Sequence, residues 1–302
     1  MPLAELPAVR INYLQMPAED EAPAPEDVVM VHGLATNMAF WYGGLAPVLT
    51  RFARVTIYDL RGHGHSSMPP SGYSPVEMAE DLRLLLDHLG IESAHMVAHS
   101  FGGMVAVIFA LSHPERVKSL VLADVRLRPV QPRLRLRQWR FAPRWHEALA
   151  EAGVTLDDDH PDSGILLLTE LARLTVERPD DARRLNETFF GAEGRLGTRT
   201  ARRWLNMLET TSAFGEITGP GPDFHRDDLK RLTQPILALV GEHSIAKASA
   251  RVLKRECPNC VLRVIPGAGH FFPLSRRQLF ARLCLRFYAA QAGWRPELGT
   301  RH

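Results

Sequence analysis

Short apolar runs alternate with helix-like stretches along most of this chain, and this alternation constrains the fold more than any other feature. Several of the runs are apolar at every position, which is typical of strands that are buried on both faces of a sheet. Strands that alternate with helices form a mostly parallel central sheet flanked by helices, the α/β class. The predicted strands cover residues 9–14, 28–31, 55–58, 94–98, 119–123, 236–240 and 261–265.

The most sharply bounded element is a helix expected over residues 75–89. Ser74 can cap its first turn, Pro75 fits the first helical position, and Glu77 completes a reciprocal capping box. An apolar face follows at helical spacing, and Gly90 ends the helix. This pattern predicts a helix that packs on the core.

The alternation of strands and helices stops between about residues 127 and 230. This segment is helical in character, rich in Arg and Leu, and interrupted by Pro and Gly. In α/β proteins, ligands bind at the carboxyl edge of the sheet. We therefore predict a core formed by residues 1–126 and 231–302, with residues 127–230 inserted as a mainly helical cap over that edge.

Composition narrows the class of partner and the location. The chain has 302 residues, 45% of them hydrophobic, and a formal net charge of +2, which does not indicate a nucleic-acid-binding protein. It lacks an uninterrupted apolar run of about 18 residues, so no membrane span is expected. The first residues lack the basic start and apolar run of a signal peptide, and we expect a cytoplasmic location.

The strongest chemical signal surrounds Ser100, where an apolar strand (residues 94–98) passes through a turn of small residues into an apolar helix. Such a turn exposes the Ser100 hydroxyl on a strained backbone at the sheet edge. The small residues Ala98 and Gly102 let the strand and the helix approach each other closely. The amino end of the helix favours negative charge at the same place.

This segment resembles the nucleophile elbow, G-x-S-x-G, of the α/β-hydrolase family, with Ala98 in place of the first glycine. The resemblance extends over roughly residues 25–125 and 232–292 and implies the fold of that family, with Ser100 as the nucleophile. Haloalkane dehalogenases and soluble epoxide hydrolases of this fold need an aspartate at this position. The serine therefore favours hydrolysis through an acyl-serine intermediate.

Two further segments resemble the family in order and spacing. Residues 28–34 are similar to the strand and His-Gly turn that build the oxyanion hole, and this implies that the backbone N–H groups of Leu34 and Phe101 bind the oxyanion. Residues 58–66 are similar to the D-x-R-G-x-G-x-S loop, which is mainly structural. We expect His63 and His65, in this loop, to be scaffold or surface residues.

The candidate base is His270. The last predicted strand leads into the loop Pro-Gly-Ala-Gly-His270, and the catalytic histidine of the family lies in such a glycine-containing loop after the final strand. The resemblance therefore implies that His270 accepts the proton of Ser100.

The acid is where this sequence departs from the family. Many members place it after the penultimate strand in a G-x-x-D pattern, but here that stretch is Gly-Glu242-His-Ser244. A serine cannot carry the negative charge that stabilises an imidazolium. Asp124 ends the preceding strand, an arrangement that resembles haloalkane dehalogenases, pancreatic-type lipases and polyketide-synthase thioesterases. We predict Asp124 as the acid and keep Glu242 as the alternative.

Residues 125–146 contain seven arginines and no acidic residue. A solvated cap surface explains such a charge run. Separately, an ion pair with Arg126 is an alternative role for Asp124. The alternative hypothesis is an anionic partner, such as an acyl carrier protein, coenzyme A or a carboxylated substrate. The arginines are Arg126, Arg128, Arg133, Arg135, Arg137, Arg140 and Arg144.

Together these residues predict a serine hydrolase that cleaves an ester or thioester with a Ser-His-Asp triad and no metal or organic cofactor. The pair Cys257 and Cys260 would form half a zinc site at best, so we interpret it as a turn between a helix and a strand. Cofactor-free dioxygenases and C–C bond lyases or hydrolases resemble the same layout. A non-catalytic ligand-binding homologue is the other alternative, since Ser244 stands where an acid is usual.

Overall fold

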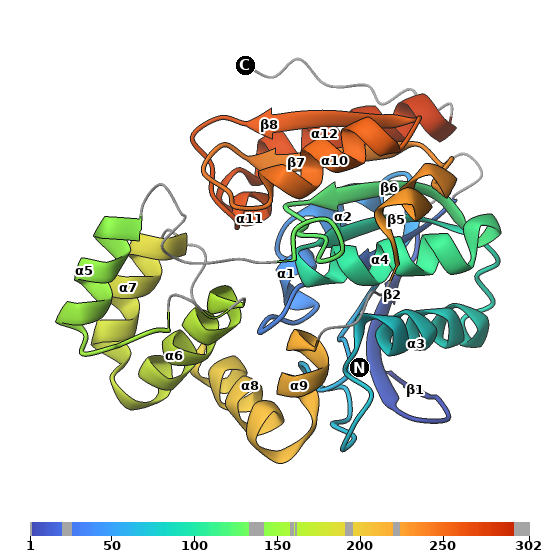
Figure 1. Ribbon diagram of the computed structural model, residues 1–302. Helices are drawn as coiled ribbons and strands as arrows, with labels where there is room; N and C mark the ends of the chain where they lie inside the picture. The colour runs from blue at the N-terminus through green and yellow to red at the C-terminus, as the bar shows by residue number, and fades with distance from the viewer. Residues whose placement is uncertain are drawn as a thin grey trace.

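The computed structural model describes residues 2–19, 26–132, 142–157, 160, 162–190, 196–219 and 224–292. An eight-stranded sheet with the order β1-β2-β4-β3-β5-β6-β7-β8 lies at its centre (Figure 1). β2 is antiparallel to both of its neighbours, and the strands from β4 to β8 in this order pair in parallel. The predicted α/β class, with a mostly parallel sheet, is therefore confirmed.

Each of the seven predicted strands is present, and one strand was not predicted. The additional strand, β1, has three residues at the sheet edge, too few to show a pattern. The strands are β1 (Leu3–Glu5), β2 (Arg10–Met16), β3 (Glu26–Val31), β4 (Ala53–Tyr58), β5 (Ala94–His99), β6 (Val117–Ala123), β7 (Ile236–Gly241) and β8 (Cys260–Ile265).

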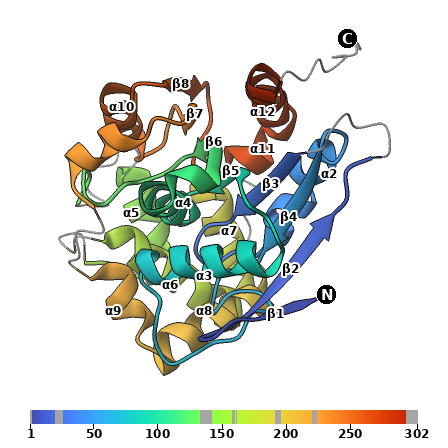
Figure 2. The same ribbon diagram turned by 90° about the vertical axis from the view of Figure 1, so that its right-hand side faces the viewer.

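Helices cover both faces of the sheet, as Figure 2 shows. Alternate residues of β3 enter two separate apolar clusters, Val29 and Val31 on one face and Val28 and Met30 on the other. This explains why the central strands are apolar at every position. One face is covered by α3 (Pro75–His88), α4 (Phe101–Ser112) and α10 (Lys247–Glu256), and the other by α1 (Ala39–Tyr42), α2 (Leu45–Leu49), α11 (Phe272–Ser275) and α12 (Arg277–Ala292).

The α3 helix has the boundaries that its sequence predicts to within one residue. The Ser74 hydroxyl accepts a hydrogen bond from the Glu77 N–H, and the Glu77 carboxylate accepts one from the Ser74 N–H, both at 3.3 Å. Gly90 has a φ of +64°, the left-handed conformation that commonly follows a helix end.

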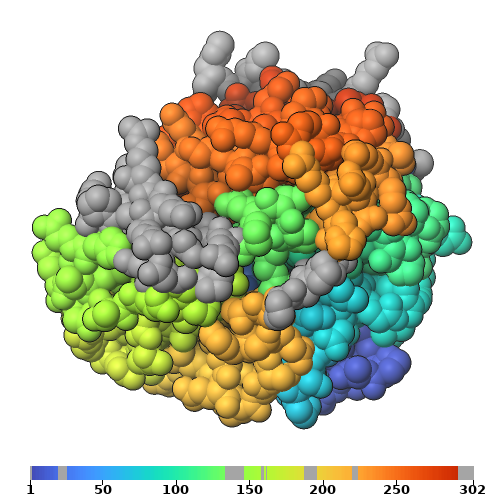
Figure 3. Space-filling view, viewed as in Figure 1, coloured from blue at the N-terminus to red at the C-terminus, as the bar shows by residue number. Residues whose placement is uncertain are grey.

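Helices are the elements found in the described residues between β6 and β7. They are α5 (Ala142–Glu151), α6 (Ser163–Glu177), α7 (Pro179–Phe190), α8 (Thr198–Thr210) and α9 (Ala213–Thr218), called the inserted helices below. A short 3₁₀ helix, Arg226–Arg231, follows them before β7, and another, Pro114–Arg116, precedes β6. α5, α6 and α7 share a small apolar cluster of their own. In Figure 3 the inserted helices form a yellow-green to gold band beside the green and orange core elements.

The loop after β4 anchors the inserted helices to the core. The Glu216 carboxylate, on α9, accepts hydrogen bonds from the backbone N–H groups of Gly72 and Tyr73. The Arg203 guanidinium, on α8, donates to the carbonyl oxygen of Ser66. Ser66 lies in the segment that resembles D-x-R-G-x-G-x-S, so this segment takes part in the contact with α8.

None of the helices in the described ranges is long and apolar enough to cross a membrane.

Candidate active site

Ser100 lies between β5 and α4 with φ 54° and ψ −123°, a strained backbone for a residue with a side chain. Its N–H donates to the Ala123 carbonyl oxygen at 3.0 Å, so the turn is held to the end of β6. A methyl group added at Gly102 would lie 2.3 Å from the carbonyl oxygen of His32. Only glycine permits this approach, which brings the amino end of α4 against the end of β3.

Asp124 reaches the same edge of the sheet as Ser100. β5 and β6 are parallel with His99 opposite Ala123, so the next residues of both strands, Ser100 and Asp124, emerge side by side. The Asp124 N–H donates to the Leu239 carbonyl oxygen at 2.8 Å, and its side chain is fully buried.

His270 connects these two residues. Its Nδ1 lies 2.6 Å from Oδ2 of Asp124, and its Nε2 lies 3.0 Å from Oγ of Ser100. An ionised carboxylate only accepts hydrogen bonds, so Nδ1 carries the hydrogen and Nε2 is left to accept from the serine hydroxyl. The structure therefore brings the three residues together in an unbroken hydrogen-bonded chain.

Ser244 supports Asp124 from the position where an acid was expected. Its hydroxyl donates to Oδ2 of Asp124 at 2.6 Å, and the Gly241 N–H donates to Oδ1 at 2.9 Å. With His270, three donors satisfy the buried carboxylate and fix its orientation. Sequence reasoning missed this role, although a hydroxyl in a G-x-x-S version of the usual motif was a signal for it.

Glu242 is outside this arrangement. Its side chain is exposed and accepts a hydrogen bond from the Gly267 N–H at 2.8 Å, while Asp124 occupies Nδ1 of His270. The suggested ion pair between Arg126 and Asp124 is also absent from the described contacts of Arg126, which pairs with Asp162 instead.

The backbone of the loop after β3 passes directly over Ser100. A methyl group added at Gly33 would lie 3.0 Å from Cβ of Ser100. The Gly33 carbonyl oxygen lies 2.7 Å from Nδ1 of His32 and accepts from the Thr36 hydroxyl at 2.8 Å. The Gly33 C=O and the Leu34 N–H belong to one trans peptide and point in opposite directions. By holding the carbonyl oxygen, His32 and Thr36 therefore also fix the direction of the Leu34 N–H.

His32 is suited to this contact because it is neutral. It is fully buried, and burial lowers its pKa. Its Nε2 accepts from the Leu60 N–H at 3.0 Å, so Nδ1 carries the hydrogen that meets Gly33. The Phe101 N–H is the first of α4 and has no acceptor within its own helix.

His99, the residue before Ser100, contacts the His270 loop, which sequence reasoning did not anticipate. Its Nε2 lies 3.0 Å from the His270 carbonyl oxygen, and its ring stacks on Phe40 with centroids 4.7 Å apart. Burial lowers the pKa of His99 well below its usual value, so the ring is neutral. His63 is buried near His32, whereas His65 is exposed.

The sequence as a whole agrees with this geometry, because the α/β hydrolase fold family matches residues 28–276. The chain belongs to the α/β-hydrolase family. It is 41% identical over 278 residues to RutD of Stutzerimonas stutzeri (strain A1501), a protein named as a carbamate hydrolase, covering 91% of this chain and 95% of RutD. RutD of Variovorax paradoxus (strain S110) is 37% identical over 282 residues, covering 91% and 97%.

A solved structure of similar shape is Est816, described as an N-acyl homoserine lactone degrading enzyme. It has a TM-score of 0.65 and 25% sequence identity, and the match covers 95% of this chain and 100% of Est816. These relatives share the hydrolase family with this chain.

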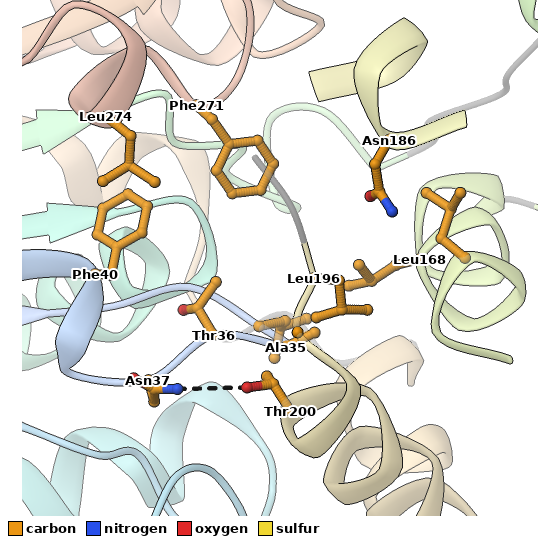
Figure 4. A pocket seen from close by; sticks show the side chains of 13 residues that line it. Ala35, Thr36, Asn37, Phe40, Leu168, Asn186, Leu196, Thr200, Phe271 and Leu274 are labelled. Atoms are coloured by element: carbon orange, nitrogen blue, oxygen red, sulfur yellow. Dashed lines mark hydrogen bonds between the residues drawn. The ribbon is translucent and has the colours of Figure 1, made fainter. Parts of the chain in front are cut away.

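This α/β hydrolase has a cavity of about 160 Å³ beside the Ser100 site. Leu34 and Phe271 contribute to it from the core, and each is adjacent to a residue of the site, Gly33 and His270. Figure 4 shows side chains of the inserted helices on the other side of the cavity. Its lining comprises Leu34, Ala35, Thr36, Asn37, Phe40, Leu168, Leu171, Asn186, Leu196, Gly197, Thr200, Phe271 and Leu274.

Cys257 and Cys260 flank the turn between α10 and β8, and both are free and buried. Burial raises the pKa of Cys257 to about 12 and that of Cys260 to about 11, so neither is a thiolate at neutral pH.

Two of the seven arginines have described side chains. Arg126 pairs with Asp162, and Arg128 donates to the Gly219 carbonyl oxygen at 3.0 Å. The other five, Arg133, Arg135, Arg137, Arg140 and Arg144, have side chains outside the described residues.

Proposed function

We propose that this α/β hydrolase is a serine hydrolase that cleaves an ester or a related acyl compound through an acyl-serine intermediate. The unbroken chain from Asp124 through His270 to Ser100 carries this proposal. A serine hydroxyl is a weak nucleophile unless a base removes its proton, and this arrangement supplies the base and the group that orients it.

In the first step, Nε2 of His270 takes the hydroxyl proton as Ser100 Oγ bonds to the carbonyl carbon. The carbonyl oxygen becomes an oxyanion, which accepts hydrogen bonds from the N–H groups of Leu34 and Phe101. Asp124 stabilises the imidazolium that forms. When the tetrahedral intermediate collapses, the bond to the leaving group breaks and His270 returns the proton to that group.

In the second step, water attacks the acyl-serine. His270 accepts the proton of the water, and the same N–H groups bind the second oxyanion. Collapse releases the carboxylic acid and returns the proton from His270 to Ser100. The cycle consumes one substrate molecule and one water molecule, and it returns Ser100 and His270 to their starting protonation states.

The named activities of the relatives support an acyl substrate. A carbamate and a lactone each contain a carbonyl carbon bonded to a leaving oxygen or nitrogen, as an ester does. The non-catalytic alternative was motivated by the serine at residue 244, and Asp124 lies where it can supply that missing charge.

Covalent labelling tests the proposal directly. A fluorophosphonate probe should label the wild-type protein, and peptide mass mapping should find the label on Ser100 alone. Ser100→Ala should abolish the labelling. A panel of p-nitrophenyl esters, acyl thioesters, carbamates and lactones should contain substrates that wild type turns over and Ser100→Ala does not. Labelling elsewhere, or oxygen consumption without acyl turnover, would contradict the proposal.

A further inference from the structure

The cavity beside the Ser100 site is mostly apolar but contains one unusual polar atom. Asn186, on α7, is 3% exposed. Its Nδ2 donates to the Ala182 carbonyl oxygen, one turn earlier in the helix, at 2.8 Å. This contact assigns Nδ2 and Oδ1 of the Asn186 amide, because the Ala182 carbonyl oxygen can accept a hydrogen bond only from the NH₂ group.

Oδ1 of Asn186 is buried without a hydrogen bond among the described residues. Figure 4 shows the side chain facing the cavity from α7. A buried acceptor without a donor is unfavourable and rare in folded proteins, so this position calls for a ligand that supplies the donor.

The neighbouring polar side chains are already engaged. Oδ1 of Asn37 accepts from the Ala39 N–H at 3.0 Å, and its Nδ2 lies 3.5 Å from the Thr200 hydroxyl. The Thr36 hydroxyl donates to the Gly33 carbonyl oxygen. Within the described part of the chain, Asn186 Oδ1 is therefore the side-chain atom of this lining that is buried without a hydrogen-bond partner.

The chemistry of the lining also restricts the ligand group. The side chains that line the cavity in the described residues are all uncharged. Because these described side chains supply no counter-charge, they favour a neutral ligand group over a charged one. The volume of about 160 Å³ is close to that of a cavity that holds a benzene-sized molecule.

We propose that the cavity binds one arm of the acyl substrate, a benzene-sized apolar group that carries a neutral hydrogen-bond donor, and that Asn186 Oδ1 accepts from this donor. The donor is a hydroxyl or an amide N–H. This inference rests on the proposed hydrolysis at Ser100, because the cavity adjoins that site through Leu34. Pockets with a buried hydrogen-bonding group reject analogues that lack the matching group.

Matched esters test the proposal. The p-nitrophenyl ester of 6-hydroxyhexanoic acid differs from that of heptanoic acid by a hydroxyl in place of a methyl group. In a second pair of esters, the same replacement of a methyl group by a hydroxyl is made in the alcohol part of the ester instead of the acid part. For one of the two pairs, wild type should show a kcat/KM at least about tenfold higher for the hydroxylated ester. Asn186→Leu should lower this ratio to about one or less.

Two further variants control the comparison. Asn186→Asp retains an acceptor and should keep the preference for the hydroxylated ester. Asn206→Leu changes an exposed asparagine on α8 and should keep the wild-type ratio. If Asn186→Leu does not fold, as judged by circular dichroism, Asn186→Ser replaces it, because its shorter side chain also withdraws the acceptor.

Binding separates this proposal from the proposed function. Ser100→Ala should bind the hydroxylated ester more tightly than its isostere in calorimetric titration. Such a preference without ester turnover by wild type would refute the hydrolase function and support the cavity proposal. Ester turnover with a ratio near one in both pairs, or with the same ratio in Asn186→Leu, would refute the cavity proposal alone.

Discussion

The hydroxyl of Ser244 donates a hydrogen bond to Oδ2 of Asp124 over 2.6 Å, which joins the loop after β7 to the carboxylate after β6. The residue at the usual acid position therefore supports an acid that the neighbouring strand provides. Oδ2 also faces Nδ1 of His270, so the serine and the histidine share one carboxylate oxygen.

Removal of the charge at Asp124 should disable the site. Asp124→Asn keeps the shape but no longer selects the Nδ1–H form of His270, and kcat/KM for an ester substrate should fall by about 10⁴-fold. Glu242→Gln is the matched control and should stay within about twofold of wild type, because Glu242 contacts the Gly267 N–H instead of His270. A collapse of activity in Glu242→Gln alone would reverse the assignment of the acid.

A carboxylate at residue 244 should compensate for the loss of Asp124. Ser244 is within hydrogen-bonding distance of Asp124 and lies in the loop after the neighbouring strand, β7. We therefore expect Asp124→Asn combined with Ser244→Asp to recover at least about tenfold in kcat/KM over Asp124→Asn, since the negative charge returns to the same side of His270. Asp124→Asn combined with Ser244→Ala is the control and should recover nothing; equal rates in both double variants would contradict the idea.

The close approach at the nucleophile turn should make Gly102 intolerant of any side chain. Gly102→Ala would place its methyl group 2.3 Å from the His32 carbonyl oxygen, so the free energy of unfolding should fall by about 3 kcal/mol or more. Gly215→Ala, in α9, meets no atom within 4 Å and should be neutral or stabilising by up to about 1 kcal/mol. Urea unfolding measures both, and similar midpoints for the two variants would show that the approach is not rigid.

Buried histidines should make the fold sensitive to acid. Burial lowers the pKa of His63 to about 3, so between about pH 6.5 and 3 the unfolded chain binds a proton that the folded chain does not. The free energy of unfolding should therefore fall with decreasing pH, and His63 should contribute up to about 1.4 kcal/mol per pH unit to this slope.

The variant His63→Gln should make this slope shallower, because it removes one titrating group from the unfolded chain. His65→Gln, at an exposed position two residues further on, should leave the slope as it is in wild type. Urea unfolding at a series of pH values measures the slopes, and equal slopes for wild type and His63→Gln would show that His63 is charged in the folded protein.

Local patterns were sufficient for most of the fold and for Ser100 and His270, whereas Asp124 was predicted as the acid from a resemblance, with Glu242 left open as the alternative. The strands were recognisable because burial on both faces makes them apolar throughout. Ser100 was recognisable because a strained turn between a strand and a helix needs small neighbours, and His270 because of its loop after the last strand. Each of these signals lies within a few consecutive residues.

The choice between Asp124 and Glu242, the support of Asp124 by Ser244 and the lining of the cavity depended on tertiary structure. Asp124 and Ser244 are separated by 120 positions, and their contact follows from the order and register of β6 and β7. Likewise, the paths of the loops after β6 and β7 at the sheet edge decide whether Asp124 or Glu242 faces His270. Asn186, on α7, lines the same cavity as the loop after β3, and no sequence period records that arrangement.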